Sequence, residues 1–307
     1  MKKKSRMKAY KEHWPLYLMM LPGLLYLLIN NYIPMAGIVI AFKKLNFAKG
    51  IFASPWAGFE NFKFLFATKD AWIITRNTLL YNVAFIIVNM VVGIAIAILI
   101  CEVRSKKMKK LYQSAILLPF LMSMVILSYI VYALLSSENG LVNNSILSAL
   151  HLDPVQWYQE PKYWPFILVI ANCWKGVGYG CLIYIASLVG IDPSFYEAAR
   201  LDGASKWQEI RTITLPCLVP TIITLLLLSI GRIFYSDFGL FYQVPMNSGV
   251  LFPTTNVIDT YVYRALIERG NISMSSAAGV YQSVVGFVIV MLSNWIVRKV
   301  DKDQALF

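Results

Sequence analysis

Residues with reactive or metal-binding side chains are few in this chain and lie far apart in the sequence. The two histidines, His13 and His151, stand alone, so no zinc site or catalytic group can be assembled around them. None of the four cysteines belongs to a C-x-x-C pair, and small buried apolar residues are the better interpretation than disulfides or metal ligands. These cysteines are Cys101, Cys173, Cys181 and Cys217. We therefore expect no catalytic and no metal site.

Nucleotide-binding chemistry is also missing from the sequence. No G-x-x-x-x-G-K-[ST] phosphate loop occurs in the chain, and this loop is the usual cradle for the phosphates of ATP. We expect the chain itself to bind no cofactor. If the protein uses ATP, a separate polypeptide must hold it.

The composition indicates which elements position the remaining polar residues. Of 307 residues, 58% are hydrophobic and only 14% are charged, and the mean hydropathy is +0.60. Soluble domains carry about 45 to 50% apolar and about 25% charged residues. About 20 apolar residues form a helix that crosses a bilayer, and continuous apolar runs lack the alternation of barrel strands. We predict an all-α polytopic membrane bundle with six transmembrane helices, at 14–42, 78–101, 113–137, 177–191 (extended back to 164 if Lys175 is tolerated), 215–231 and 274–297.

Basic residues between the apolar runs indicate the orientation. The net charge of +12 would also suit nucleic acid, but its distribution favours a membrane. Residues 1–13, 102–112, 192–214 and 298–307 hold seventeen Lys and Arg in 57 positions, against nine in 99 positions for the other three connecting segments. Cytoplasmic segments are enriched in Lys and Arg, so both termini are expected in the cytoplasm, and no nucleic acid partner is expected. The first apolar run is too long for a cleaved signal peptide.

One cytoplasmic segment, residues 191–216, carries clear helix signals. Asp192 followed by Pro193 is typical of a helix start, and Gly203 suits the left-handed conformation that ends a helix. Ser205 and Gln208 have the spacing of a capping box, which predicts a second helix. The expected structure is a helix–turn–helix elbow that projects from the membrane. A helix this short is marginal alone in water, so we expect it to pack against something.

The elbow also carries a longer pattern, Glu197-Ala198-Ala199, then Gly203, then Ile213 and Leu215-Pro216. With this spacing the chain resembles the permease subunits of ATP-binding-cassette importers, in the group for oligosaccharides from plant and other complex polysaccharides. Further matching motifs are Leu21-Pro22-Gly23, Tyr32-Ile33-Pro34, Ala41-Phe42, Ser54-Pro55-Trp56-Ala57-Gly58-Phe59-Glu60-Asn61-Phe62, Asn77-Thr78, Asp202-Gly203-Ala204 and Val257-Ile258-Asp259-Thr260-Tyr261-Val262-Tyr263-Arg264.

The resemblance implies a type I importer permease that moves oligosaccharides inward by alternating access. Its partners would be a second homologous permease, a cytoplasmic ATPase dimer that holds ATP and Mg, and an extracytoplasmic solute-binding protein, in a bacterial plasma membrane. It divides the chain into a cytoplasmic tail (1–13), a first helix with an extracytoplasmic segment (14–73), the importer transmembrane domain (74–297) and a second cytoplasmic tail (298–307). The residues expected to couple the elbow to the ATPase are Tyr196, Glu197, Ala198, Ala199, Asp202 and Gly203.

Two polar clusters are candidates for the substrate pathway. Lys175 lies about 16 Å into its span, where a charge needs a cavity, a partner or a cluster of carbonyls. We keep two interpretations open, a structural contact to the partner permease or a pathway lining that would favour acidic sugars. The first cluster adds Asn172, Trp174, Tyr179 and Tyr184, and the second, at the outer end of the fifth span, contains Arg232 and Tyr235.

Other interpretations of these residues remain. Arg232 can pair with Asp237 or extend to the interface. The alternative function is an ion-coupled secondary transporter, but the interiors of the spans contain no Asp or Glu, which such transporters use. An integral membrane transferase would need an Asp or His cluster at the interface, and none occurs.

Overall fold

The computed structural model describes residues 2–63 and 68–300, with side chains described from His13 onward. The basic side chains of the predicted N-terminal tail and residues 301–307 of the predicted C-terminal tail lie outside the described residues. Within them the regular secondary structure is helical, apart from one isolated antiparallel bridge between Lys43 and Trp56. The all-α prediction is confirmed.

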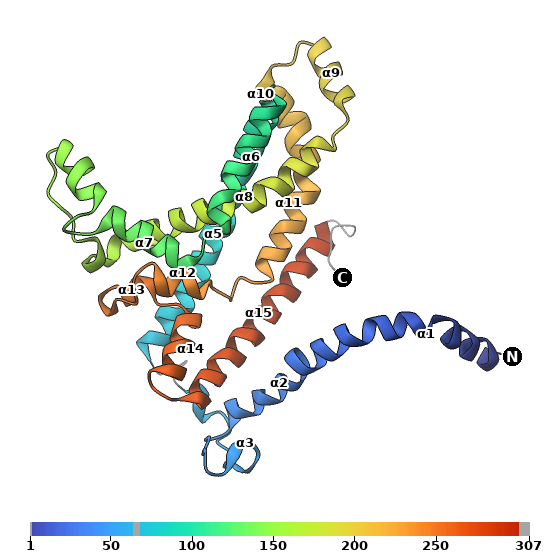
Figure 1. Cartoon of the computed structure of the whole chain (residues 1–307), viewed down its shortest axis with the longest axis vertical. Coiled ribbons are helices and arrows are strands. Elements are labelled where there is room, and N and C mark those ends of the chain that lie inside the picture. The colour runs from blue at the N-terminus through green and yellow to red at the C-terminus, as the bar shows by residue number, and fades with distance from the viewer. Residues whose placement is uncertain (1, 64–67, 301–307) are drawn as a thin grey trace.

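Figure 1 shows how the long helices and the short helices between them are arranged. The long helices are α1 (Lys2–Leu27), α5 (Lys69–Glu102), α6 (Lys106–Leu121), α7 (Met124–Leu135), α8 (Trp164–Val189), α11 (Leu215–Ile230) and α15 (Ile272–Val300). The shorter ones are α2 (Ile33–Met35), α3 (Gly50–Ala53), α9 (Pro193–Leu201), α10 (Lys206–Glu209), α12 (Phe238–Gln243), α13 (Phe252–Thr255) and α14 (Ile258–Ile267).

Among the described residues, five helical stretches are long and apolar enough to cross a bilayer, and a bent pair supplies the sixth candidate. The five straight candidates are His13–Phe42, Lys69–Glu102, Pro161–Val189, Lys206–Ile230 and Ile272–Lys299. The third of these includes Lys175, as the extended form of the prediction requires. By length and composition the described chain therefore supports the six predicted spans.

The third predicted span is not one straight helix. Helix α6 ends and α7 begins at an angle of 96°, because Met122 adopts an extended conformation (φ −76°, ψ 145°). Ser123 then starts a new helix, since its side chain accepts a hydrogen bond from the Ile126 amide at 3.3 Å. Pro119 has no amide hydrogen to donate to the helix before it, which weakens α6 close to the break. The prediction of one continuous helix over 113–137 was therefore wrong, because the span is bent.

Helices α5 and α8 pack along each other at the centre of the molecule, and three apolar clusters lie beside this pair. One cluster joins Phe85 of α5 and Leu168 of α8 to Phe241 of α12. A second, nearer the elbow, joins α5 and α8 to Leu218 of α11. The third joins Ile74 of α5 to α14 and α15. These contacts fix the bundle that surrounds the site.

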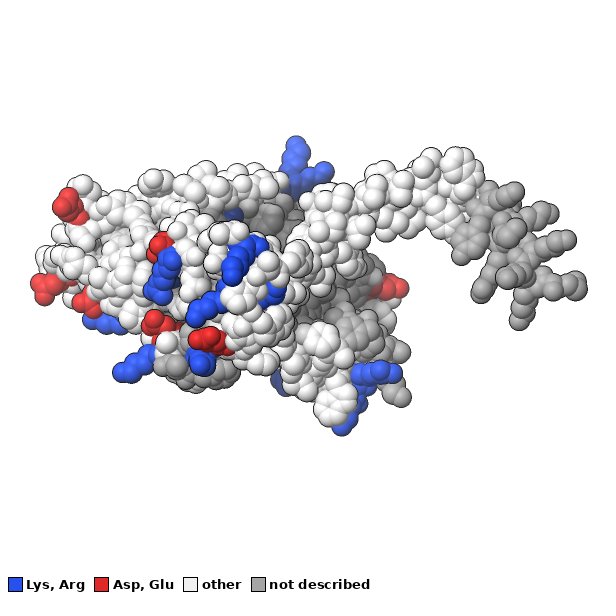
Figure 2. Space-filling view, turned by 90° about the horizontal axis from the view of Figure 1, so that it is seen from below, with Lys and Arg blue, Asp and Glu red and all other residues white. Residues whose placement is uncertain are grey.

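Helix α1 lies apart from this bundle. It extends away from α15 and ends far from the other helices (Figure 1). In the most apolar window of His13–Phe42 only 6% of residues are buried, compared with 17 to 28% in the other straight spans. Figure 2, which views the end of the molecule that lies at the bottom of Figure 1, shows basic and acidic side chains, several of them close together, on a mostly uncharged surface. An apolar helix with so little cover from its own chain leaves a surface for lipid or protein.

Candidate translocation cavity and coupling elbow

A cavity of about 510 Å³ lies between α5, α8 and the end of α11. Five of the seven predicted pathway residues line it, namely Asn172, Tyr179, Tyr184, Arg232 and Tyr235. The two remaining candidates, Trp174 and Lys175, are not among its lining residues. The cavity therefore brings together parts of both predicted polar clusters, from helices that are distant in the sequence.

The sequence analysis missed the α5 wall of this cavity. Asn82 and Asn89 line it together with Phe85, Ile86 and Met90. The two asparagines are seven residues apart, which is two helical turns and places them on one face. That spacing of amides within an apolar helix was the signal available in the sequence.

Several polar groups of the cavity are already paired with one another. Asn89 Nδ2 donates to Asn172 Oδ1 at 2.8 Å, across the α5–α8 contact. Asn82 Nδ2 donates to the Thr78 carbonyl oxygen at 2.8 Å. The Tyr235 hydroxyl lies 3.2 Å from the Ser283 hydroxyl on α15. These bonds hold the amides and hydroxyl groups in fixed positions around the space.

Two groups of the cavity have unused hydrogen-bonding capacity. Asn89 Oδ1 is a buried acceptor with no partner among the described residues. Within the same described residues, no hydrogen bond or ion pair joins the Arg232 side chain to another group, and Asp237 instead accepts from the Leu240 amide at 3.1 Å to cap α12. The alternative of an Arg232–Asp237 pair is therefore not what the structure shows. Of these two groups, the exposed Arg232 guanidinium is the one that can meet a polar solute in the cavity.

The Lys175 side chain contacts backbone carbonyls of the third predicted span. Its Nζ atom donates to the carbonyl oxygens of Phe120 and Met122 at 3.0 and 2.5 Å and lies 3.5 Å from that of Pro119. These carbonyls belong to the last turn of α6 and the break that follows it, where a helix has no amide partners of its own. A charge at this depth was expected to need a cavity, a partner or a cluster of carbonyls. The structure shows a cluster of backbone carbonyls, which belong to the same chain.

The elbow has the predicted local structure. Asp192 Oδ1 accepts from the Ser194 amide at 2.9 Å at the start of α9, and this bond lowers the pKa of the Asp192 carboxyl. Gly203 has φ +79°, in the left-handed region. The capping box of α10 is complete, with Ser205 N to Gln208 Oε1 at 2.7 Å and Gln208 N to Ser205 Oγ at 3.4 Å. In Figure 1, α9 and α10 lie at the opposite end of the molecule from α3 and α14.

The predicted coupling residues fall into two groups within this elbow. Glu197, Ala198, Asp202 and Gly203 are exposed, whereas Tyr196 and Ala199 are half-buried against their own chain. The Tyr196 hydroxyl lies 3.0 Å from Thr214 Oγ1, which ties α9 back to the entry of the fifth span. Phe195 and Leu201 expose 58% and 90% of their surface. Helix α9 therefore exposes two large apolar side chains, interspersed with the charged side chains of Glu197 and Arg200.

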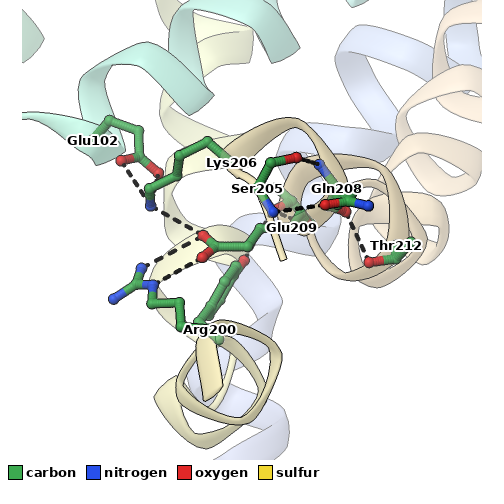
Figure 3. Close-up of polar contacts among 9 residues, drawn as sticks. Glu102, Arg200, Ser205, Lys206, Gln208, Glu209 and Thr212 are labelled. Atoms are coloured by element: carbon green, nitrogen blue, oxygen red, sulfur yellow. Dashed lines mark hydrogen bonds and ion pairs between the residues drawn. The ribbon is translucent and has the colours of Figure 1, made fainter. Parts of the chain in front are cut away.

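A chain of charged side chains, which the sequence analysis missed, lies on the inner side of the elbow (Figure 3). Arg200 Nε donates to Glu209 Oε1 at 2.8 Å, and Lys206 Nζ donates to Glu209 Oε2 at 3.0 Å. Lys206 also reaches Glu102, at 3.2 Å. The Glu209 side chain is 3% exposed. The bond to Glu209 raises the pKa of Arg200.

Comparison with known proteins gives consistent results for sequence and structure. Residues 76–302 match the family described as binding-protein-dependent transport system inner membrane component. Protein LplB of Bacillus subtilis is 34% identical over 97% of this chain and 93% of its own length. The polygalacturonan/rhamnogalacturonan transport system permease protein YteP of the same organism is 34% identical over 94% of this chain and 89% of its own length.

A solved structure shares the fold over nearly the whole chain. It is a chain of a bacterial ABC transporter involved in the import of the acidic polysaccharide alginate, with a TM-score of 0.88, 35% identity and coverage of 97% of this chain and 99% of that one. No finding supports the ion-coupled alternative. The chain therefore belongs to the family of binding-protein-dependent transport system inner membrane components, as a permease subunit and not an enzyme.

Proposed function

We propose that this permease forms one half of an ATP-driven importer for oligosaccharides and works by alternating access. ATP and Mg²⁺ are bound and ATP is hydrolysed on a separate cytoplasmic ATPase dimer, and the elbow carries the resulting motion into the membrane. The observation that carries this proposal is the exposure of two large apolar side chains, Phe195 and Leu201, on a short helix at one end of the bundle. A nine-residue helix with Phe195 and Leu201 exposed is unfavourable in water alone and fits a cleft in a partner.

A second permease subunit is part of this proposal. Helix α1 exposes most of its apolar surface to its surroundings, and the cavity is lined by α5, α8 and the end of α11. A homologous subunit would close the pathway from the other side. The family description and a related alginate transporter solved with its substrate-bound periplasmic protein support a solute-binding protein as the partner that delivers sugar from outside.

The proposed orientation places the elbow and both termini in the cytoplasm of a bacterial cell. This orientation is supported by the high density of Lys and Arg in the elbow segment 192–214, in the connecting segment 102–112 and in both terminal tails. An ATPase dimer can reach the elbow only from that side. Cysteine labelling of intact cells tests the orientation, because an elbow residue should react only with a membrane-permeant reagent.

Acidic oligosaccharides are the substrate class that the cavity fits best. The Arg232 guanidinium, unpaired among the described residues, can bind a carboxylate through two parallel N–H donors, and Asn82 places an amide in the same cavity. Tyr179, stacked on Phe120 with ring centroids 5.2 Å apart, presents an aromatic wall. The names of two relatives, for polygalacturonan and for alginate, point to the same class.

Co-purification followed by reconstitution tests the proposed function. The tagged permease should bring down a second permease and an ATPase, and the ATPase in vesicles should be stimulated by the binding protein loaded with an oligosaccharide. Uptake by the permease alone, without any ATPase, would contradict the proposal.

Replacement of Arg232 by Gln tests the substrate class. We expect the KM for uptake of an acidic oligosaccharide to rise about tenfold, equivalent to about 1.4 kcal/mol, with little change for a neutral oligosaccharide of the same length. Arg232→Lys, which keeps the charge, is the matched control. An equal loss for both sugars in Arg232→Gln would place Arg232 in the framework of the cavity instead.

A further inference from the structure

The charged chain of the elbow ends on a helix that does not adjoin the elbow in sequence. Along the chain, α9 and α10 connect α8 to α11. Lys206 nevertheless contacts Glu102, the last residue of α5, which is 104 positions away. Figure 3 shows the continuous set of contacts from Arg200 through Glu209 and Lys206 to Glu102. The elbow is therefore joined to three helices, two by the backbone and one by side chains.

Glu209 holds the two halves of the elbow together. Its side chain is 3% exposed, and a buried carboxylate needs charged partners to offset its lost hydration. Arg200 approaches it from α9, with Nη2 3.5 Å from Oε2 in addition to the shorter Nε contact, and Lys206 approaches it from α10. Because both cations come from the elbow itself, α9 and α10 are locked into one unit.

The contact between Lys206 and Glu102 differs from this lock. The two side chains are 56% and 52% exposed, and exposed ion pairs contribute little to stability. A small pocket of about 160 Å³ separates the elbow from α5 at this point, lined by Cys101 and Glu102 on one side and Tyr196 and Glu209 on the other. A contact that adds little to stability but spans two elements fixes their relative position.

Helix α5 connects this contact to the cavity. It runs unbroken from Lys69 to Glu102 and contains no proline, whereas the third span is bent by 96°. Asn89 and Asn82 are 13 and 20 residues before Glu102, which places them about 20 and 30 Å along the helix. A displacement of the inner end of α5 therefore moves the cavity wall that carries both asparagines.

We infer that Glu209 and Lys206 are positioning residues that transmit displacement of the elbow, through Glu102, to α5 and so to the amide wall of the cavity. This inference rests on the proposed docking of the elbow onto an ATPase. Without the contact, the elbow would still move α8 and α11 through the backbone, but α5 would follow only through its packing against these helices. ATP hydrolysis would then continue with less sugar moved.

The test uses the complete reconstituted importer and measures the ATPase rate and the sugar uptake in the same vesicles. Glu102→Gln and Lys206→Met should assemble normally and keep an ATPase rate close to that of the unmodified complex. Sugar moved per ATP should fall at least about fivefold, the lower end of the range for coupling between two sites. Glu60→Gln, an exposed carboxylate far from the elbow in sequence, is the control.

Charge reversal separates positioning from a loss of structure. In the variant Glu102→Lys, the amine introduced at position 102 faces Lys206, and the two groups repel each other. Adding Lys206→Glu restores an attraction of opposite sense at the same place, while Glu209 keeps Arg200 as its charged partner, so sugar moved per ATP should recover. If the double variant stays as poor as Glu102→Lys alone, or if Glu102→Gln leaves sugar per ATP unchanged, the inference is overturned.

These outcomes are distinct from a failure of the proposed function. An unmodified complex that shows no ATPase, or uptake that does not depend on ATP, contradicts the proposed function itself. An unmodified complex that couples normally, with variants that couple equally well, contradicts only the transmission to α5.

Discussion

In two regions of this permease a lysine amine contacts several oxygen atoms, in one case within a membrane-spanning stretch and in the other at an exposed position. At the break of the third span, Lys175 binds backbone carbonyls of Phe120 and Met122 within a membrane-spanning stretch. At the elbow, Lys206 binds two carboxylates at an exposed position. The first arrangement supplies a hydrogen-bond donor to carbonyls that the broken helix leaves without amide partners, and the second joins the elbow to α5.

The surroundings decide what each lysine contributes. In a bilayer no water can hydrogen-bond a free carbonyl, so each unsatisfied group costs several kcal/mol and Lys175 becomes part of the framework. At the surface, water and salt weaken the contacts of Lys206, which leaves about 0 to 1 kcal/mol for an exposed pair. A strong contact suits a fixed part of the bundle, whereas a weak one at the surface can hold the elbow to α5 while adding little to the stability of the fold.

The largest effect is expected at Gly178, which sets the distance between α6 and α8. A Cβ atom at this position would overlap the Ile116 carbonyl oxygen, and backbone cannot easily move away. Gly178→Ala should destabilise the protein by about 3 kcal/mol, at or above the usual upper range for overpacking, and should also separate Lys175 from the break. The measurement is the melting temperature of the purified protein in detergent. Gly180→Ala is the control, because nothing lies within 4 Å of a Cβ atom there.

The next effect is expected for Lys175→Met, which keeps the volume but leaves the carbonyls of the break without a donor. The loss should be about 1 to 3 kcal/mol, the cost of an unsatisfied buried group, and should appear as a lower melting temperature. Lys175→Arg should retain most of the stability. If Lys175→Met instead changed selectivity between acidic and neutral sugars at full stability, Lys175 would belong to the pathway after all.

The two regions also show why one could be predicted from the sequence and the other could not. The helix signals of the elbow are local, since Asp192 and Ser194, or Ser205 and Gln208, are two or three residues apart, whereas its contact between Lys206 and Glu102 spans 104 positions and was not predicted. At the break, the lysine that binds the free carbonyls is 53 residues from Met122 and comes from another helix. The apolar pattern of 113–137 is the same for a straight or a bent span. Asn82 and Asn89 were recognisable by spacing, but only packing shows which face of α5 meets the cavity.

Gly203 tests whether the elbow must keep its local geometry. A β-branched residue is strained by about 1 to 2 kcal/mol in the left-handed conformation, although no atom lies within 4 Å of a Cβ atom at this position. Gly203→Val should therefore shift the turn between α9 and α10 and uncouple ATP hydrolysis from uptake. Gly203→Asn, which tolerates this conformation, should behave almost normally. Unchanged uptake and ATPase rates for Gly203→Val in reconstituted vesicles would count against the role of the turn.

The smallest effect on stability is expected for Lys206→Met, the counterpart of Lys175→Met. Glu209 keeps Arg200 as a charged partner at 2.8 Å, and the Lys206 side chain is 56% exposed, so the loss should be at most about 1 kcal/mol. Salt separates the two lysines further, because the screening length falls from about 10 Å at 0.1 M to about 3 Å at 1 M. The melting temperature of Lys206→Met should converge on that of the unmodified protein at about 1 M NaCl, whereas the deficit of Lys175→Met should persist. Equal salt sensitivity of the two variants would mean that water reaches the break of the third span, and that both lysines act in the same kind of environment.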